Sequence, residues 1–130
     1  MNLHAIDLVL IGLQLATALG IVVFWFWWFR AEHDESSWPE GYRQHEQAFV
    51  VPDLLLAFLL VVSSLTSLGD VAQGSKIALI AAGMMLFLAI FDATYFVQQG
   101  MFARERGGVG NAFLVGGLLI LSLVMILHHA

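Results

Sequence analysis

Four long runs of apolar residues divide this chain, and they constrain its fold more than any other feature. The runs are continuous rather than alternating, which indicates helices rather than the strands of a barrel. A helix needs about 20 apolar residues to cross a bilayer, where no water can satisfy an open backbone. The sequence therefore predicts an all-α polytopic membrane protein, with a four-transmembrane-helix bundle as one domain over residues 1–130. The expected helices cover about residues 8–29, 48–68, 76–99 and 110–127.

Composition supports a membrane location and excludes several classes of function. The chain is 60% hydrophobic and 12% charged, whereas a soluble domain carries about 25% charged residues. The absence of cysteine excludes thiolate metal sites and cysteine nucleophiles. A net charge of -5 leaves no basic face for nucleic acid. The expected partners are the lipid bilayer and either further copies of this chain or another membrane protein.

Local signals predict where the helices begin and end. Residues 38–41 read Trp-Pro-Glu-Gly and predict a turn. Ser75 is expected to cap the third helix and Asn111 the fourth, while Gly100 is a typical C-terminal stop. The first helix is expected to be retained, because the segment before it lacks the basic residues of a signal peptide. Close helix packing is expected at three glycines, Gly83, Gly116 and Gly117.

The basic residues predict an orientation. The loops 30–47 and 100–109 must lie on one side of the membrane, since two helices separate them. They contain four arginines, at positions 30, 43, 104 and 106. The opposite side has only Lys76. The positive-inside rule therefore predicts that both loops are cytoplasmic. A dual-topology homodimer is the alternative, and the expected location is a bacterial plasma (inner) membrane.

The same topology predicts a polar site near the arginine-rich side. The second helix leaves that side and the third returns to it, so Asp53 and Asp92 lie at one level, ~9 Å deep at 1.5 Å per residue. Tyr95 and Gln99 follow Asp92 on its helical stripe, and the aromatic end of the first helix reaches this level. The predicted ligand-binding residues are Asp92, Asp53, Tyr95, Gln99, Trp25 and Trp28.

Two longer stripes suggest a cavity below these carboxylates. Ser64 and Ser67 follow Asp53 on the second helix, and Met85 and Leu88 continue the stripe of Asp92 on the third. Their spacing predicts that these side chains face a common space.

Each predicted site residue also has a structural interpretation. Asp53 directly follows Pro52, a combination that often opens a helix. A carboxylate as deep as Asp92 needs a partner, which a hydrogen bond within the bundle could supply. Tyrosines and tryptophans often anchor helices at the membrane interface, and serines often hydrogen-bond neighbouring helices.

The histidines do not predict a metal or haem site. All five lie outside the expected spans, and His45-Glu46 has no further ligand at the spacing of known metal motifs. The sequence also has no Ser–His–Asp, HExxH, GxSxG or phosphate-loop pattern. Neither a metal nor a cofactor is therefore expected.

The chain resembles small bacterial four-helix membrane proteins of unknown function. The resemblance rests on the aromatic end of the first helix and on three short segments, at residues 49–53 (Phe-Val-Val-Pro-Asp), 92–95 (Asp-Ala-Thr-Tyr) and 111–114 (Asn-Ala-Phe-Leu). It implies a four-helix bundle and no particular activity. The signature residues of the four-helix drug exporters and of the small fluoride channels are absent.

Three functions fit these observations. The first is binding or transport of a small cationic or amphipathic ligand, or of protons, at the site near the cytoplasmic face. The second is an intramembrane enzyme that uses Asp53 and Asp92 as an acid–base pair on a lipid-like substrate. The third is an accessory subunit that packs against a larger membrane protein through the small-residue stripe Gly12, Ala16 and Gly20.

Overall fold

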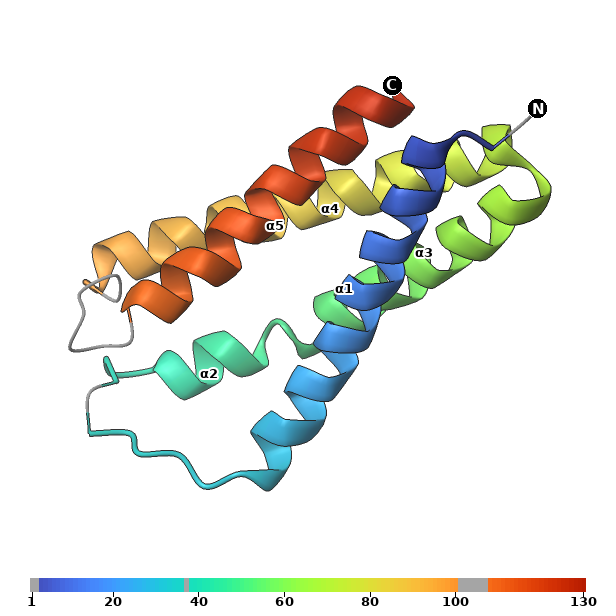
Figure 1. Ribbon diagram of the computed structural model, residues 1–130. Coiled ribbons are helices and arrows are strands. Elements are labelled where there is room, and N and C mark those ends of the chain that lie inside the picture. The colour runs from blue at the N-terminus through green and yellow to red at the C-terminus, as the bar shows by residue number, and fades with distance from the viewer. Residues whose placement is uncertain (1–2, 37, 101–107) are drawn as a thin grey trace.

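The computed structural model describes residues 3–36, 38–100 and 108–130, and the described part contains helices and no strands (Figure 1). The helices are α1 (Ala5–Arg30), α2 (Tyr42–Gln47), α3 (Val50–Gly69), α4 (Val71–Gln98) and α5 (Gly108–His129). The start of α1 and the end of α5 lie near the α3–α4 connection, and the α1–α2 connection lies at the other end. This arrangement confirms the all-α four-helix bundle.

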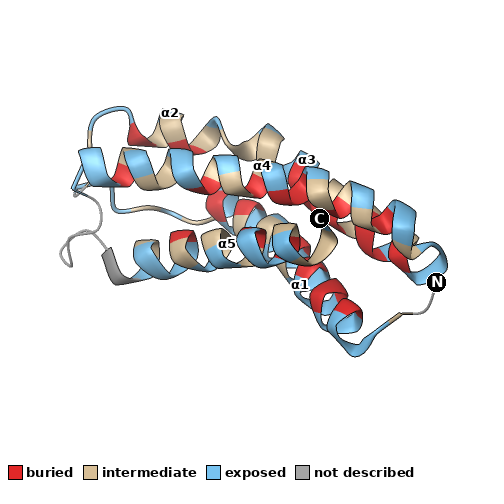
Figure 2. Cartoon of the chain, turned by 90° about the horizontal axis from the view of Figure 1, so that it is seen from above, coloured by how far each residue is buried: buried red, intermediate tan, exposed pale blue. Residues whose placement is uncertain are grey.

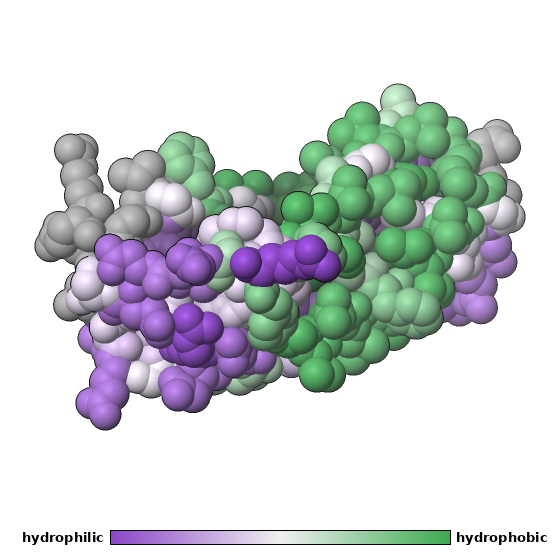
Figure 3. Space-filling model, turned by 90° about the horizontal axis from the view of Figure 1, so that it is seen from below, coloured by the Kyte–Doolittle hydropathy of each residue, from purple (hydrophilic) through white to green (hydrophobic). Residues whose placement is uncertain are grey.

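Four segments of this fold are long and apolar enough to cross a membrane, namely α1, α2 together with α3, α4, and residues 110–129 of α5. Their most apolar windows are only 17–28% buried inside the bundle. Buried residues follow the sides on which α3 and α4 face each other, and the outer sides are exposed (Figure 2). An apolar zone separates a broad hydrophilic patch at one end from a smaller one at the other (Figure 3). Such surfaces suit contact with lipid tails.

The second membrane segment begins earlier than predicted and contains a break. Helical structure starts at Tyr42, after the predicted turn, in which Gly41 has a φ of 78°. Regular helix then stops at Gln47 and resumes at Val50. Pro52 explains the break, because it has no N–H and its ring collides with the carbonyl four residues earlier, at Ala48. The short helix α2 is therefore set off from α3.

The boundaries of α4 and α5 also differ from the prediction. Ser75 does not cap the third long helix, because α4 begins at Val71 with Asp70 as its cap, and the Asp70 carboxylate accepts from the Gln73 N–H at 3.2 Å. Since α5 begins at Gly108, Asn111 lies inside that helix. The predicted stop at Gly100 is confirmed, since α4 ends at Gln98 and Gly100 has a φ of 67°. The arginines at 104 and 106 lie outside the described residues.

The long helices pack in the order α1–α3–α4–α5, and α1 has few contacts with α5. The two helices meet near the chain termini, where His128 Nε2 lies 2.7 Å from Asp7 Oδ1. Next to this contact, the Ser75 hydroxyl lies 2.9 Å from His129 Nδ1. From there α1 and α5 diverge toward the other end of the bundle (Figure 1). The bundle is therefore open on one side.

The deep serines hold helices together and do not line a cavity. The Ser63 hydroxyl donates to the Gly74 carbonyl at 3.0 Å, and the Ser64 hydroxyl donates to Gln14 Oε1 at 3.3 Å. Ser67 packs so closely on Gly74 that a Cβ atom there would collide with it. The structural interpretation of the serines as residues that hold helices together is confirmed. The alternative prediction, that Ser64 and Ser67 face a common space with the carboxylates, is wrong. The predicted close packing at Gly83, Gly116 and Gly117 is wrong too, since a Cβ atom at these positions would meet nothing within 4 Å.

Candidate functional site

A crevice of about 430 Å³ lies where α1 and α5 diverge. Its floor comes from α3 and α4, because these helices pack between α1 and α5. Its wall is mainly apolar and includes Ile21, Phe24, Met85, Leu88, Leu118 and Leu121. The prediction that Met85 and Leu88 share a space with Asp92 is confirmed.

Three carboxylates also line this crevice, Glu46 from α2, Asp53 from the first turn of α3 and Asp92 from α4. Asp53 Oδ2 accepts a hydrogen bond from the Trp25 indole at 3.0 Å. Asp92 Oδ1 lies 3.5 Å from His45 Nε2. Glu46 is only 8% exposed, and its Oε2 has no hydrogen-bond partner among the described residues. The carboxylate end of the crevice is thus rich in acceptors.

No lysine or arginine of the described residues forms an ion pair with these carboxylates. Arg43 is on α2 but donates to Glu35 Oε1 at 3.1 Å, and its guanidinium lies 5.5 Å from the Trp38 ring. The hydrogen bond from Arg43 lowers the pKa of Glu35, which is exposed in the loop. Arg43 therefore pairs with a loop residue rather than with a carboxylate of the crevice.

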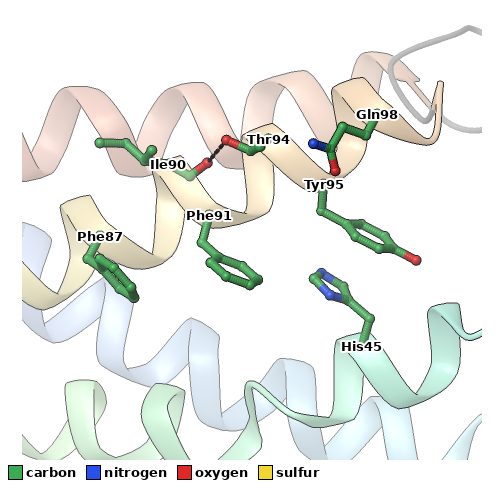
Figure 4. Close-up of a pocket in the computed structure, with 7 residues that line it drawn as sticks. All are labelled: His45, Phe87, Ile90, Phe91, Thr94, Tyr95 and Gln98. Atoms are coloured by element: carbon green, nitrogen blue, oxygen red, sulfur yellow. Dashed lines mark hydrogen bonds between the residues drawn. The ribbon is translucent and has the colours of Figure 1, made fainter.

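His45 is held by stacking against α4. Its ring lies 3.5 Å from the Tyr95 ring at an interplanar angle of 8°, and a second stack on Phe91 spans 6.0 Å. Figure 4 shows the imidazole between α2 and α4, facing Tyr95. These rings belong to a separate groove on the outer side of α4, which includes Thr94 and Gln98. The stacks fix the ring where its Nε2 points at Asp92.

The six residues predicted to form the site occupy different places. Asp53 and Asp92 line the crevice, and Trp25 adjoins it through its bond to Asp53. Tyr95 lines the outer groove rather than the crevice and stacks on His45. Two predicted residues line neither space, Trp28 and the exposed Gln99 at the C-cap of α4.

The aromatic end of α1 is divided between the interior and the surface. Trp25 and Trp28 are 3% and 5% exposed, whereas Phe26, Trp27 and Phe29 are at least half exposed. Trp28 stacks on Trp38 at 5.5 Å and 5°. The outward rings suit the anchoring role of interfacial aromatics, and the inward pair belongs to the core near the carboxylates.

Asp53 does not act as a helix cap. Its backbone N–H donates to the Phe49 carbonyl at 2.8 Å, inside the first turn of α3, and its side chain turns to Trp25. The start of α3 at Val50 also places Pro52 beyond the first helical position. The structural interpretation of Asp53 as an ordinary helix-start residue therefore does not describe its contacts.

Sequence reasoning missed Glu46 and His45. A usable signal was present, because Glu46 precedes Asp53 by seven residues, or about two helical turns. That spacing places both carboxylates on one side if the helical structure extends toward Tyr42. The predicted second helix began at residue 48, after Glu46, and this start hid the signal.

Comparisons with known proteins add no assignment to this geometry. No family model, no curated protein and no solved structure matches the chain.

Proposed function

We propose that this chain binds an amphipathic organic cation in the crevice between α1 and α5. The apolar part of the ligand lies along the crevice wall, and its positive group lies at Glu46, Asp53 and Asp92. The observation that carries this proposal is an apolar crevice with three carboxylates, to which no lysine or arginine in the described part of the chain is paired.

Electrostatics favours a cation over an anion or a neutral ligand. Carboxylates away from water are costly unless an opposite charge or a hydrogen-bond donor faces them. His45 and Trp25 face Asp92 and Asp53, and the Tyr42 side chain hydrogen-bonds Glu46. Glu46 Oε2 has no hydrogen-bond partner among the described residues. A positive ligand group stabilises all three, and an anion is repelled by them.

The size and position of the crevice fit a small organic molecule that is already dissolved in the bilayer. Ligand pockets commonly have volumes of about 300–1,000 Å³, and this one is about 430 Å³. Exposed residues of α5, Phe113 and Leu114, form part of its wall. A lipophilic cation can therefore enter sideways from the lipid, without first crossing water.

We propose that the carboxylate end of the crevice lies at the cytoplasmic side of a bacterial plasma membrane. The support is the positive-inside rule, with four arginines in the two loops of that end against Lys76 at the other. Transport of the ligand to the other side of the membrane would require α1 and α5 to separate at their Asp7–His128 contact. The proposal is therefore limited to binding of the ligand.

Labelling of introduced cysteines tests this orientation, and the chain has no cysteine of its own. Ser36→Cys lies in the loop after α1, and Gln73→Cys lies at the opposite end; both positions are exposed. In intact cells an impermeant thiol reagent should label Gln73→Cys and should label Ser36→Cys only after lysis. The reverse pattern would contradict the orientation, and labelling of both variants would show that the chain inserts both ways.

Binding of tetraphenylphosphonium tests the ligand class. The purified protein in detergent should bind this cation saturably and should not bind tetraphenylborate, an anion of nearly the same size and shape. Asp53→Asn should weaken cation binding roughly tenfold, which corresponds to about 1.4 kcal/mol, because it removes a charge and keeps an oxygen for Trp25. Equilibrium dialysis gives both affinities.

The matched control is Asp34→Asn, which removes an acid from the exposed loop, far from the crevice lining. It should bind tetraphenylphosphonium like the wild type. Equal binding of the cation and the anion, or equal weakening by Asp34→Asn and Asp53→Asn, would contradict the proposed function.

A further inference from the structure

His45, Glu46 and Asp92 form a cluster of possible metal ligands where α2 meets α4. Each offers one ligand atom, and these atoms all lie within 4.8 Å of one another. We propose that this cluster binds a divalent first-row transition-metal ion such as Zn²⁺ or Mn²⁺. Residue spacing does not indicate this site, because Asp92 is 46 residues from Glu46 and only the fold brings them together.

The buried carboxylate of Glu46 is the first independent support. Glu46 is 8% exposed, and its Oε2 lacks a hydrogen-bond partner among the described residues. Native proteins rarely leave a buried polar atom without a hydrogen-bond partner, and a bound ion is one way in which such an atom is satisfied. A bound cation at this cluster supplies the missing partner.

The distance between His45 and Asp92 is the second support. Nε2 and Oδ1 are 3.5 Å apart, which exceeds the 2.7–3.2 Å usual for a hydrogen bond from nitrogen. Two ligands at about 2.1 Å from a tetrahedral zinc ion are separated by about 3.4 Å. The observed gap therefore fits a shared metal ion better than a direct hydrogen bond.

The positions of the side chains are set before any ion binds. Tyr95 and Phe91 stack on the His45 ring and leave its Nε2 directed at Asp92. Glu46 follows His45 in α2, so one short helix supplies two ligands and α4 supplies the third. Such preorganisation lowers the entropic cost of binding.

The ligand types select the class of metal. One imidazole with two carboxylates suits Zn²⁺ or Mn²⁺, whereas Ca²⁺ takes six to eight oxygen ligands and Cu⁺ prefers sulfur. Three protein ligands leave coordination positions open. Since Glu46 and Asp92 also line the crevice, a metal ion there competes with the organic cation proposed above for the same charges.

The metal site does not depend on the proposed function, because each has a residue that the other lacks. His45 belongs to the metal cluster and not to the crevice lining, and Asp53 belongs to the crevice lining and not to the cluster. His45→Phe keeps an aromatic ring for the stacks and removes the nitrogen ligand. Asp53→Asn leaves all three metal ligands in place.

Titration of the metal-free, full-length protein with ZnCl₂ and with MnCl₂ tests the inference. The wild type should bind one ion per chain. Zinc binding is measured by equilibrium dialysis, and manganese binding by electron paramagnetic resonance. His45→Phe and Glu46→Gln should each weaken binding more than about a hundredfold, since loss of a residue that only supports a ligand already costs 10–100-fold. Asp53→Asn should bind zinc like the wild type, and CaCl₂ should not compete.

Binding of tetraphenylphosphonium by His45→Phe, measured in parallel, shows that this variant is folded. Zinc should displace tetraphenylphosphonium from the wild type. Unchanged zinc affinity in both His45→Phe and Glu46→Gln would overturn the metal site. His128→Asn alters only the opposite end of the bundle, so loss of the bound ion in this variant would overturn the metal site too. Zinc binding without tetraphenylphosphonium binding would instead remove the proposed function and leave the metal site standing.

Discussion

The Asp92→Asn variant should bind both the organic cation and the metal ion more weakly than the wild type, because Asp92 lies in the crevice lining and in the metal cluster. The amide keeps the shape of the side chain but removes its charge and makes it a poor metal ligand. Zinc binding should fall more than about a hundredfold, as for any lost ligand of the cluster. Tetraphenylphosphonium binding should fall at least about tenfold, or 1.4 kcal/mol.

Three single variants should then differ in which ligand they bind weakly, a difference that general unfolding of the protein cannot produce. Asp53→Asn should weaken only the organic cation, His45→Phe only the metal ion, and Asp92→Asn both. Thermal unfolding in detergent, followed by circular dichroism, should show all three variants folded. Normal affinity of Asp92→Asn for both ligands would leave Asp92 as a structural residue bonded to His45.

Gly117→Phe should abolish tetraphenylphosphonium binding without removing a charge. Gly117 lies on the crevice wall from α5, is exposed, and has open space where a Cβ atom would point. A phenyl ring there occupies volume that the ligand needs, and its Cβ atom meets nothing within 4 Å, so we expect the fold to be retained. Equilibrium dialysis measures the affinity of this variant for tetraphenylphosphonium and, separately, for zinc.

Gly116→Phe is the matched control, since Gly116 also has open space around it but does not line the crevice. It should bind both ligands like the wild type. Zinc should also bind normally to Gly117→Phe, because α5 contributes no ligand to the metal cluster. Equal tetraphenylphosphonium affinity in Gly116→Phe and Gly117→Phe would show that the cation binds outside the crevice.

The depth of Asp53 and Asp92 in the membrane was predictable from the sequence. Each long apolar run is a helix, and consecutive helices run in opposite directions, so counting residues from a loop places Asp53 and Asp92 at one level. Both carboxylates do line the same crevice. This argument needs only the length of the helices and their connectivity.

The direction in which each helix faces was not predictable in the same way. An apolar side chain of a membrane helix suits both lipid and protein, so hydrophobicity does not mark the inner face. Ser64 and Ser67 were assigned to the cavity from their helical spacing after Asp53, yet they bond or pack against neighbouring helices. Trp28 was placed in the site by its level and Gln99 by its position on the helical stripe of Asp92, and neither lines the crevice.

The crevice and the metal cluster depend on features that span the whole chain. The divergence of α1 and α5 follows from how each packs on α3 or α4, and no local pattern records it. The break before Pro52 sets off α2 from α3, and α2 carries Glu46 and His45. Pro52 signals the break, but the ligands become visible only once Asp92 of α4 lies beside them.

The position of a bound cation tests the central claim most directly. Tetraphenylarsonium has the shape of tetraphenylphosphonium, and its arsenic atom can be located in a crystal by anomalous scattering. The account predicts one arsenic peak per chain between α1 and α5, at the end of the crevice formed by Glu46, Asp53 and Asp92. An arsenic peak on the outer groove beside Phe87 and Phe91, or among the exposed acids of the loop after α1, with the crevice empty, would contradict it.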